Sequence, residues 1–496
     1  MKDGFISVAA ATPKVRVADC RFNTESILET IRVAQAQGVK ILCLPELCVT
    51  AYTCADLFFQ SSLLSAAEQS LEAILEETKD TDMLCAVGLP VRRGMKLYNC
   101  AAVIHAGQLL GIVPKQYLPG HGEYSESRHF ASGTAAAESF IFAGQDTIFG
   151  TDLLFACETM PNLTVGIEIS EDLWVINPPS ARLAAAGASL ILNPSAIDAL
   201  VGKDEYFTSL VSVQSKRLIC GYVCASCGDG ESTTDLVFGA HNIIAENGAV
   251  LSESRYQGGV LRSEIDLERI AHDRMRITAF VSEGEEDFIS VPFALEPAET
   301  ELTRFVAPMP FVPDDLAKRD SRFAEILEIA ALGLCKRLEH THAKTAVVGL
   351  SGGLDSTLAI LTTEKAMRML SRPMTDIIAV TMPCFGTTNR TRSNAVILAE
   401  RIGARLRTVN ITESVLSHFR DIDQSPDNHD VTYENSQARE RTQVLMDIAN
   451  QENGMVIGTG DLSELALGWA TYNGDHMSMY GVNASIPKTR IRRLVD

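Results

Sequence analysis

Short apolar runs alternate with amphipathic stretches from the N-terminus to about residue 275. Residues 5–10 (FISVAA) and 40–47 (KILCLPEL) are typical of buried strands, and residues 23–38 between them carry apolar positions at helical spacing. Further strand-like runs follow at residues 84–90 and 99–104. Strands that alternate with helices in this way predict a layered α/β domain over residues 1–275.

The pattern changes at residues 276–320, where acidic and proline-bearing segments replace most of the apolar runs. We expect this segment to be a linker, although its residues 288–291 (FISV) have the composition of a strand. A helix that starts near Phe323 then leads into a buried strand at residues 345–350 (TAVVGL). The second domain is therefore predicted to span residues 321–496.

Composition narrows the class of protein. The 496 residues are 46% hydrophobic and 21% charged, as in a folded globular enzyme rather than a disordered chain. The net charge is −20, and no basic run is present that would follow a nucleic-acid backbone, so we expect no nucleic-acid partner. No apolar stretch approaches the ~20 residues of a membrane span, so we expect no membrane partner and a cytoplasmic location.

The twelve cysteines lack a compact disulfide framework, which fits a reducing compartment. Cys220, Cys224 and Cys227 have the spacing of an iron–sulfur ligand loop. They also lie in a run, residues 218–225 (LICGYVCA), that is typical of a buried strand, where cysteines are small apolar side chains. We favour the core interpretation.

The most informative stretch of the second domain is residues 350–357 (LSGGLDST). It follows an apolar strand and leads into a helix, so adjacent glycines and the positive end of the helix would face an anion. The G-x-x-x-x-G-K-[ST] spacing of kinases and GTPases is absent. The stretch resembles instead the SGG-x-DS loop of ATPases that release pyrophosphate and adenylate a carboxylate or carbonyl.

Three polar residues of the first domain stand at the ends of strands. Glu46 ends one buried strand, Lys115 follows another, and Ser170 begins an acidic elbow, Ser170-Glu171-Asp172-Leu173-Trp174. A buried carboxylate must be paired or used, and a strand-to-turn elbow suits a nucleophile. Taken singly, each also has an ordinary structural interpretation.

Together the three residues resemble the Glu–Lys–Cys triad of the nitrilase superfamily, in the form found in glutamine-dependent NAD synthetases, whose elbow reads C-E-D-L-W. The resemblance implies that Glu46 is the general base, that Lys115 stabilises the oxyanion with a neighbouring backbone N–H, and that position 170 is the nucleophile. It further implies glutamine-binding residues. These are Tyr52, Glu171 and Ser195.

Position 170 departs from the family because it is Ser rather than Cys. A hydroxyl is a far weaker acid than a thiol, so we expect glutamine hydrolysis to be severely impaired. Either an engineered substitution or a natural loss explains the serine, and the intact surrounding pattern favours the first. His121, where many relatives carry tyrosine, is a smaller departure that affects the expected glutamine contacts.

Four motifs of the second half match the NAD synthetase domain: the SGG-x-DS loop, the E-N-x-Q-A-R helix start, the G-T-x-D-x-x-E turn and the Y-N-G-D loop. The resemblance implies a Mg²⁺ site at Asp355 and Glu464. The implied ATP-binding residues are Ser351, Gly352, Gly353, Leu354, Asp355, Ser356 and Thr459. The implied deamido-NAD-binding residues are Glu434, Asn435, Arg439 and Asp475.

Two arginines, Arg390 and Arg392, follow the strand at residues 376–383, where ligands bind in open α/β sheets. A solvated loop is an equally good interpretation of either one.

The implied fold is a nitrilase-like α-β-β-α sandwich followed by a Rossmann-like doubly wound parallel sheet of the adenine nucleotide alpha hydrolase type. The implied activity is the amidation of deamido-NAD to NAD through an acyl-adenylate, with ATP and Mg²⁺ and with ammonia from glutamine. The family forms homo-oligomers, octamers in several bacteria, and channels ammonia. It also continues beyond the position of Asp496 with a segment that closes over the ATP site, so we expect either a truncation or a natural lack of that segment.

Two other functions stay open at this point. One is a different amidotransferase-type ligase that adenylates another acid. The other is a non-catalytic nucleotide-binding protein with a decayed amidase.

Overall fold

The computed structural model describes residues 4–312, 315–385 and 389–495, without the side chains of residues 389–392. The chain divides into two compact units, Met1–Val306 and Ala307–Asp496, which are described separately. None of the described helices is both long enough and apolar enough to span a membrane.

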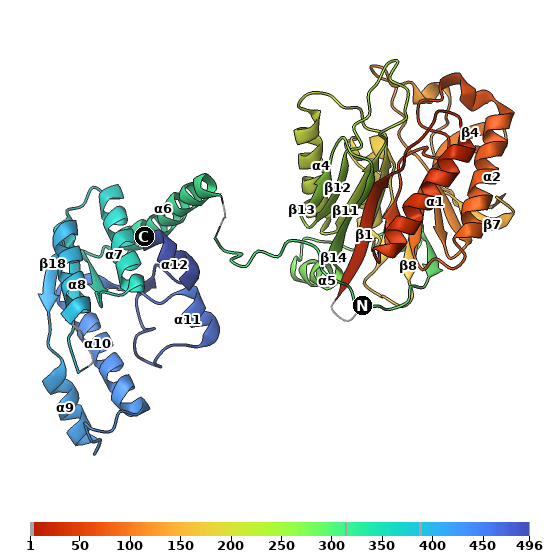
Figure 1. Ribbon diagram of the computed structural model, residues 1–496. Coiled ribbons are helices and arrows are strands. Elements are labelled where there is room, and N and C mark those ends of the chain that lie inside the picture. The colour runs from red at the N-terminus through yellow and green to blue at the C-terminus, as the bar shows by residue number, and fades with distance from the viewer. Residues whose placement is uncertain (1–3, 313–314, 386–388, 496) are drawn as a thin grey trace. The chain divides into compact units, whose positions relative to one another are not determined.

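Two stacked sheets form the centre of the first unit (Figure 1). The described strands of one sheet follow the order β14-β1-β2-β3-β4-β5-β7-β6. Their bounds are Gly259–Asp266, Phe5–Thr12, Ile41–Cys43, Leu84–Arg93, Lys96–His105, Gln108–Pro114, Gln145–Phe149 and Glu138–Phe142. The other sheet follows the order β13-β12-β11-β10-β9-β8-β15. Its strands span Ala249–Ser254, Asn242–Glu246, Gly221–Ser226, Leu190–Ser195, Thr164–Ile167, Leu153–Cys157 and Ile289–Phe293.

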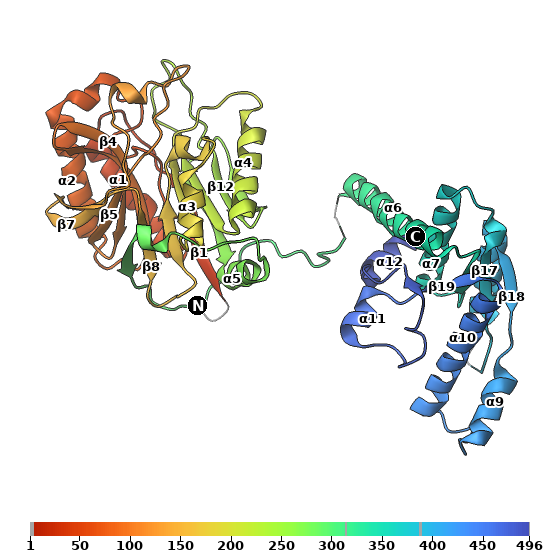
Figure 2. The same ribbon diagram turned by 180° about the vertical axis from the view of Figure 1, so that it is seen from behind.

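Helices cover the outer face of each sheet. Helices α1 (Cys20–Ala36) and α2 (Ser61–Glu77) pack on the first sheet, and α3 (Pro179–Ala185) and α4 (Lys203–Leu218) pack on the second (Figures 1 and 2). Helix α5 (Leu267–Arg276) follows β14. The layers are therefore α-β-β-α, which confirms the sandwich predicted for this part of the chain.

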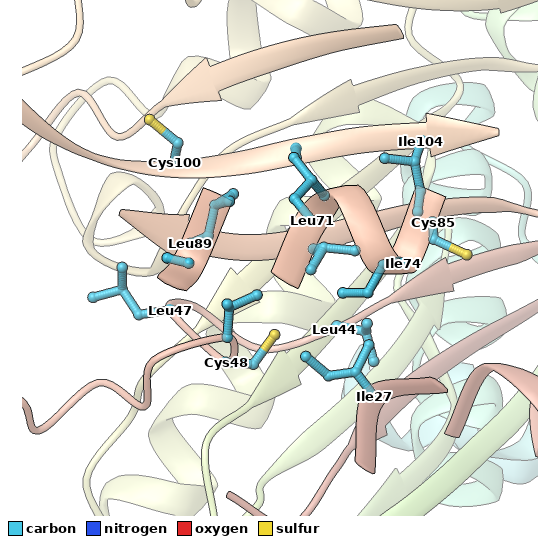
Figure 3. Packing of buried hydrophobic residues seen from close by; sticks show 14 of the residues in the cluster. Ile27, Leu44, Leu47, Cys48, Leu71, Ile74, Cys85, Leu89, Cys100 and Ile104 are labelled. Carbon is cyan, nitrogen blue, oxygen red and sulfur yellow. The ribbon is translucent and has the colours of Figure 1, made fainter. Parts of the chain in front are cut away.

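The alternation of side chains along the strands explains the layers. On β1, Val8 and Ala10 face the core between the sheets, whereas Ala9 and Ala11 face the core under α1 and α2. Figure 3 shows part of this outer core, in which Ile27 of α1 and Leu71 and Ile74 of α2 lie over the strands. Strand β1 is buried on both faces, so its sequence reads as a continuous apolar run rather than an alternating one.

The segment expected to be a linker is partly integrated into the first unit. Its strand β15 pairs in parallel with β8, and Thr159 accepts from the backbone N–H of Leu295. Arg304 then forms a bidentate ion pair with the fully buried Glu246 of β12. Residues 289–304 are therefore held by backbone pairing and by buried charge.

The second unit has one sheet, whose described strands follow the order β18-β17-β16-β19-β20. The strands span Arg405–Thr408, Ile377–Thr381, Thr345–Gly349, Gly454–Gly458 and Tyr480–Gly481, and all their pairings are parallel. The helices α6 to α12 span Leu316–Thr341, Leu354–Met369, Asn389–Ile402, Thr412–Asp421, Val431–Gln451, Leu462–Leu467 and Lys488–Val495.

Helices pack on both faces of this sheet. Helices α6, α7 and α8 share a core with one face, and α10 packs on the other. The strand order reverses direction between β16 and β19, and ligands bind at such a point in doubly wound sheets. The predicted Rossmann-like fold is confirmed, and it places the SGG-x-DS loop and Thr459 on either side of this point.

Candidate active sites

In the first unit, the three triad residues lie at the carboxyl ends of strands from both sheets. Glu46 follows β2, Lys115 follows β5, and Ser170 begins a 3-10 turn shortly after β9. The Asp172 carboxylate joins the last two segments, because it accepts the backbone N–H groups of Gln116 and Tyr117 at 3.1 and 2.8 Å. The structure therefore brings the predicted residues into one region.

Glu46 and Lys115 form a buried ion pair. The Lys115 Nζ lies 2.6 Å from Glu46 Oε1, and both side chains are about 1% exposed or less. Asn99 Nδ2 donates to the same oxygen at 2.6 Å, whereas Glu46 Oε2 has no hydrogen-bond partner among the described residues. One carboxylate oxygen is thus fixed, and the other is available for proton transfer.

Burial raises the pKa of Glu46 to about 8, an effect that the charge of Lys115 opposes and that of Glu126 reinforces. Burial alone would lower the pKa of Lys115, but the Glu126 and Glu46 carboxylates hold it above its ordinary value. Lys115 therefore stays cationic, and Glu46 exchanges its proton near neutral pH. These are the states that an oxyanion donor and a general base require.

Glu126 is a buried member of this cluster that sequence reasoning missed. Its Oε1 lies 2.7 Å from Lys115 Nζ and accepts from the Tyr52 hydroxyl at 2.7 Å. Its Oε2 accepts from Asn99 Nδ2 at 3.2 Å. The sequence holds only an indirect signal for Glu126. A buried lysine beside one carboxylate still has N–H donors that need acceptors, but the irregular loop around residue 126 has no strand-end pattern that would point to one.

The elbow at Ser170 holds a backbone conformation that is uncommon for a residue with a side chain. Its φ is +48°, in the left-handed region. The Ser170 N–H donates to Asn193 Oδ1 at 2.8 Å, and the Ala196 N–H donates to Ser170 Oγ at 3.3 Å. The side-chain oxygen of residue 170 is thereby oriented by its own backbone and by β10.

Ser170 opens into a pocket of about 310 Å³. The pocket is lined by Pro119, His121, Tyr124, Ser170, Glu171, Trp174, Ala196, Ile197 and Lys203. Burial raises the pKa of the Glu171 carboxyl, and the charge of Lys115 opposes that rise. Lys203 supplies a cation on the same wall, where it ion-pairs with Asp198 and lies over the Trp174 ring.

Of the three residues implied to bind glutamine, only Glu171 lines this pocket. Ser195 is fully buried, and its hydroxyl bonds Asn193 and contacts Cys224 Sγ. Tyr52 instead bonds Glu126 and lines a neighbouring pocket of about 270 Å³ that reaches the same glutamate. His121, the residue noted as a departure from the family, is on the pocket wall.

The Cys220, Cys224 and Cys227 group belongs to the core, as favoured from the sequence. All three side chains are 3% exposed or less. Cys220 and Cys224 pack in the core under α4, whereas Cys227 packs with Ala196 and Phe238 in a separate cluster. The three thiols therefore do not converge on one point.

In the second unit, residues 350–353 form the turn between β16 and α7, and residues 354–356 are the first residues of the helix. Gly352 has φ +81°, which a side chain would disfavour, and Gly353 is the N-cap of α7. Ser351 and Ser356 bond each other through their hydroxyls at 3.1 Å, and Gly353 N–H donates to Ser351 Oγ. The turn leaves backbone N–H groups at a helix N-terminus, where anions bind favourably.

A pocket of about 500 Å³ lies at the carboxyl ends of β16, β17 and β19. Of the predicted ATP and deamido-NAD residues, Ser351, Thr459 and Asp475 line it. Arg441 of α10, which sequence reasoning did not single out, also lines it, and burial lowers the pKa of its guanidinium while leaving the group cationic. The pocket therefore joins the glycine turn to a cation and to polar groups.

Three carboxylates meet beside the glycine turn: Asp355, Asp461 and Glu464. Each offers an oxygen within 4.8 Å of the others, and Asp461 is fully buried. Asp355 Oδ1 has no hydrogen-bond partner among the described residues. Carboxylate oxygens in this arrangement fit a hard divalent cation such as Mg²⁺. Asp461 was not predicted, although it stands within the G-T-x-D-x-x-E turn.

Lys488 of α12 places its ammonium among these carboxylates. Its Nζ lies 2.7 Å from Asp355 Oδ2, 3.1 Å from Asp461 Oδ2 and 3.5 Å from Glu464 Oε1. Burial would lower the pKa of Lys488, but its bonds to Asp355 and Asp461 hold that pKa above its ordinary value. Lys488 thus supplies the positive charge at this centre.

The remaining predicted residues connect α10 to the loop at residues 471–476. Asn435 Oδ1 accepts from Thr471 Oγ1 at 2.9 Å, and Arg439 Nε donates to Tyr472 O at 3.2 Å. Asp475 Oδ1 accepts the Thr471 N–H. Glu434 is exposed on the same helix. The side chains of Arg390 and Arg392 lie outside the described part of the structure.

Two families match the chain. The family described as carbon-nitrogen hydrolase matches residues 7–275, and the family described as NAD synthase matches residues 326–496. A glutamine-dependent NAD(+) synthetase of Mycobacterium tuberculosis H37Rv is 40% identical over 510 aligned residues, which cover 99% of this chain and 75% of that protein. The Mycobacterium leprae protein with the same description is 37% identical, also over 99% of this chain and 75% of that protein.

Solved structures with a similar fold include a glutamine-dependent NAD(+) synthetase from Cytophaga hutchinsonii. The TM-score is 0.48 and the identity 24%, over 99% of this chain and 80% of that chain. An amidase from Nesterenkonia sp. matches 56% of this chain and 97% of its own, with a TM-score of 0.43 and 19% identity.

Proposed function

The chain belongs to the family of glutamine-dependent NAD(+) synthetases, and on that premise we propose which of its residues perform each half of the reaction. The enzyme is a carbon–nitrogen ligase that amidates deamido-NAD in an ATP-dependent reaction, with ammonia that comes from glutamine. The first unit releases the ammonia, and the second uses it. The buried Glu46–Lys115 pair beside the Ser170 elbow is the observation that supports this division most directly.

In the first unit, Glu46 accepts the proton of the nucleophile at position 170 as that nucleophile attacks the glutamine carboxamide. Lys115 stabilises the oxyanion of the tetrahedral intermediate. Glu46 then gives the proton to the leaving ammonia, and water, deprotonated by Glu46, releases glutamate from the acyl-enzyme. The free Oε2 and raised pKa of Glu46 and the permanent charge of Lys115 support these roles.

The serine makes the first half slow. The Ser170 hydroxyl is a much weaker acid than a thiol, and the Ala196 N–H at 3.3 Å provides one neutral hydrogen bond to an alkoxide. Ser170→Cys should raise glutamate release by at least ~10²-fold, the scale on which nucleophile activation acts. The test of this role measures glutamate release, with and without added glutamine, for the Ser170 protein, for Ser170→Cys and for Ser170→Ala as the matched control. Equal rates for all three proteins would contradict it.

In the second unit, the backbone of residues 351–356 binds the ATP phosphates, and Thr459 contacts the nucleotide. The nicotinate carboxylate of deamido-NAD, held by residues of α10 and of the 471–476 loop, attacks the α-phosphorus, and pyrophosphate leaves. Ammonia then attacks the acyl-adenylate carbon and AMP leaves. The N-terminus of α7, Arg441 and Lys488 supply the positive charge that two adjoining anions require.

We assign a Mg²⁺ site to Asp355 and Glu464, with Asp461 as the neighbouring carboxylate. A bound Mg²⁺ would neutralise phosphate charge and polarise the leaving group. The Lys488 ammonium contacts oxygens of the same three carboxylates, so a bound Mg²⁺ would compete with Lys488 for them.

We also infer from the family resemblance that the chain works as a homo-oligomer, in which an enclosed route between subunits would keep ammonia from protonating and diffusing away in water. Light scattering coupled to size exclusion checks this: a multiple of 53.8 kDa is expected. A monomer that still couples glutamine hydrolysis to NAD formation in the Ser170→Cys protein would contradict it.

A further inference from the structure

A chain of buried hydrogen bonds ends at the backbone of the nucleophile. Glu168, Asn193 and Tyr222 are all 1% exposed or less, and each comes from a neighbouring strand or strand end of one sheet. The Tyr222 hydroxyl donates to Glu168 Oε1, and Asn193 Nδ2 donates to the Tyr222 oxygen at 2.8 Å. Asn193 Oδ1 then accepts the Ser170 N–H at 2.8 Å.

The direction of these bonds is set at one end of the chain. An ionised carboxylate only accepts, so Glu168 accepts the hydrogen bond of the Tyr222 hydroxyl and leaves the phenol oxygen as an acceptor for a further donor. The Asn193 amide must then turn its NH₂ group toward Tyr222 and its oxygen toward Ser170. The other Glu168 oxygen is fixed by the Ser180 N–H at 2.8 Å. A single carboxylate thus fixes the orientation of the amide that holds residue 170.

Such a network is costly where it lies. It is embedded among the apolar side chains under α3 and α4, where hydrophobic residues of similar size would cost less free energy. Its far end is a non-glycine residue at φ +48°, a strained conformation that persists only when its surroundings enforce it. The network ends at the position where the proposed reaction needs a directed side chain.

We propose that Glu168, Tyr222 and Asn193 act together as positioning residues: they hold the backbone of residue 170 in the left-handed conformation that aims the nucleophile at the glutamine carboxamide. None of the three lines the pocket. The inference rests on the proposed amidase function for its kinetic consequence but on the hydrogen bonds alone for its structural consequence, so the two can be tested separately.

The test uses the full chain with Ser170→Cys as the parent, and compares it with Tyr222→Phe, with Glu168→Gln and with both together. Tyr222→Phe keeps the ring and removes only the hydroxyl, whereas Glu168→Gln presents an NH₂ group where only acceptors fit. Ser215→Ala is the control, since it removes another fully buried hydrogen bond of the same unit, from Ser215 Oγ to Cys220 O at 2.7 Å.

In the glutaminase assay, misplacement of the nucleophile should lower kcat by about 10–100-fold while KM for glutamine changes by less than about threefold. Because the residues act as one unit, the double variant should lose no more than the worse single variant. A rise in KM at constant kcat, or losses that add in the double variant, would overturn the proposal.

Amide hydrogen exchange supplies a second arm that needs no activity. Peptides that span residues 168–172 should exchange faster in Tyr222→Phe and Glu168→Gln than in the parent. Their exchange rate in Ser215→Ala should equal that of the parent. Should Tyr222→Phe fail to fold, Glu168→Gln alone decides. A parent without glutaminase activity would refute the proposed amidase, while unchanged exchange at residues 168–172 would overturn the positioning role.

Discussion

At position 170 a hydroxyl stands where we propose that the reaction needs a stronger acid. The neighbouring groups fit the proposed amidase: among the described residues, Glu46 has one fixed oxygen and one without a hydrogen-bond partner, and two carboxylates hold Lys115 cationic. A site that had lost its function would not need to bury this much charge. We therefore propose that the serine changes the chemistry of the site without changing the arrangement of the groups around it.

The pKa of Glu46 has a consequence for stability. The value of about 8 in the folded chain exceeds the ordinary 4.5, so Glu46 takes up a proton on folding. Its contribution to the free energy of unfolding is complete below about pH 4.5 and is lost as the pH rises to about 8. In Glu46→Gln the fall of Tm across that window should be smaller. Parallel Tm curves for the two proteins would show that this titration does not occur.

Gly88 of β3 fixes the backbone that carries Glu46. A Cβ at this position would lie 2.2 Å from Pro45 O and 2.4 Å from Leu47 N, and backbone atoms cannot move aside as a side chain can. Gly88→Ala should therefore lower the free energy of unfolding by roughly 1–3 kcal/mol.

Denaturant unfolding of Gly88→Ala measures that change. Gly120→Ala is the matched control, because the nearest atom to its Cβ is Ser127 Oγ at 3.4 Å. An equally large loss of unfolding free energy in Gly120→Ala would refute the claim that close backbone contact at Gly88 excludes a side chain.

The residues that sequence reasoning missed share one property. Each acts through a partner outside its own local pattern: Glu126 pairs with Lys115, eleven residues away in an earlier segment, and Lys488 pairs with Asp355 and Asp461. Strand-end position made Glu46, Lys115 and Ser170 candidates, because a strand end is visible in the local pattern, and the family resemblance implied their roles. A carboxylate in an irregular loop or a lysine at the start of a helix has no such signal, and only the fold supplies the distance.

At the scale of elements, the apolar runs predicted the strands well and their ends less well. Residues 40–47 suggested one strand, but pairing stops at Cys43 because Leu44 to Leu47 turn to present Glu46. Residues 276–320 read as a linker because prolines and acids dominate them. The parallel pairing of β15 with β8 depends on a partner more than a hundred residues away, and composition does not reveal it.

Helix α11 carries two of the three carboxylates at its N-terminus. Asp461 and Glu464 cap it reciprocally, since Glu464 N–H donates to Asp461 Oδ1 at 2.8 Å and Asp461 N–H donates to Glu464 Oε2 at 3.1 Å. Glu464→Ala should lower Mg²⁺-dependent NAD formation by at least ~10–100-fold, which is the loss of activity typical when a group beside a metal ligand is mutated. In the Ser170→Cys background it should leave glutamate release unchanged.

Glu464→Gln separates charge from capping, because its amide oxygen still accepts the Asp461 N–H. If the carboxylate acts through its charge, Glu464→Gln loses as much NAD formation as Glu464→Ala. Full activity of Glu464→Gln would assign Glu464 to helix capping alone.

At the scale of the whole molecule, each unit has its own core and its own site. The SGG-x-DS turn lies at the point where the strand order of one sheet reverses, and the amidase residues lie where the strands of two other sheets end. The sequence predicted both folds because their motifs fall at strand ends in the expected order. A change at position 170 should therefore affect only the source of nitrogen.

The most direct measurement compares NAD formation from deamido-NAD and ATP·Mg²⁺ with ammonium and with glutamine as the nitrogen donor. We predict that the chain uses ammonium, that it uses glutamine at least ~10²-fold more slowly, and that Ser170→Cys restores glutamine without changing the rate with ammonium. Equal rates with both donors in the Ser170 protein, or no NAD formation with ammonium, would contradict the account.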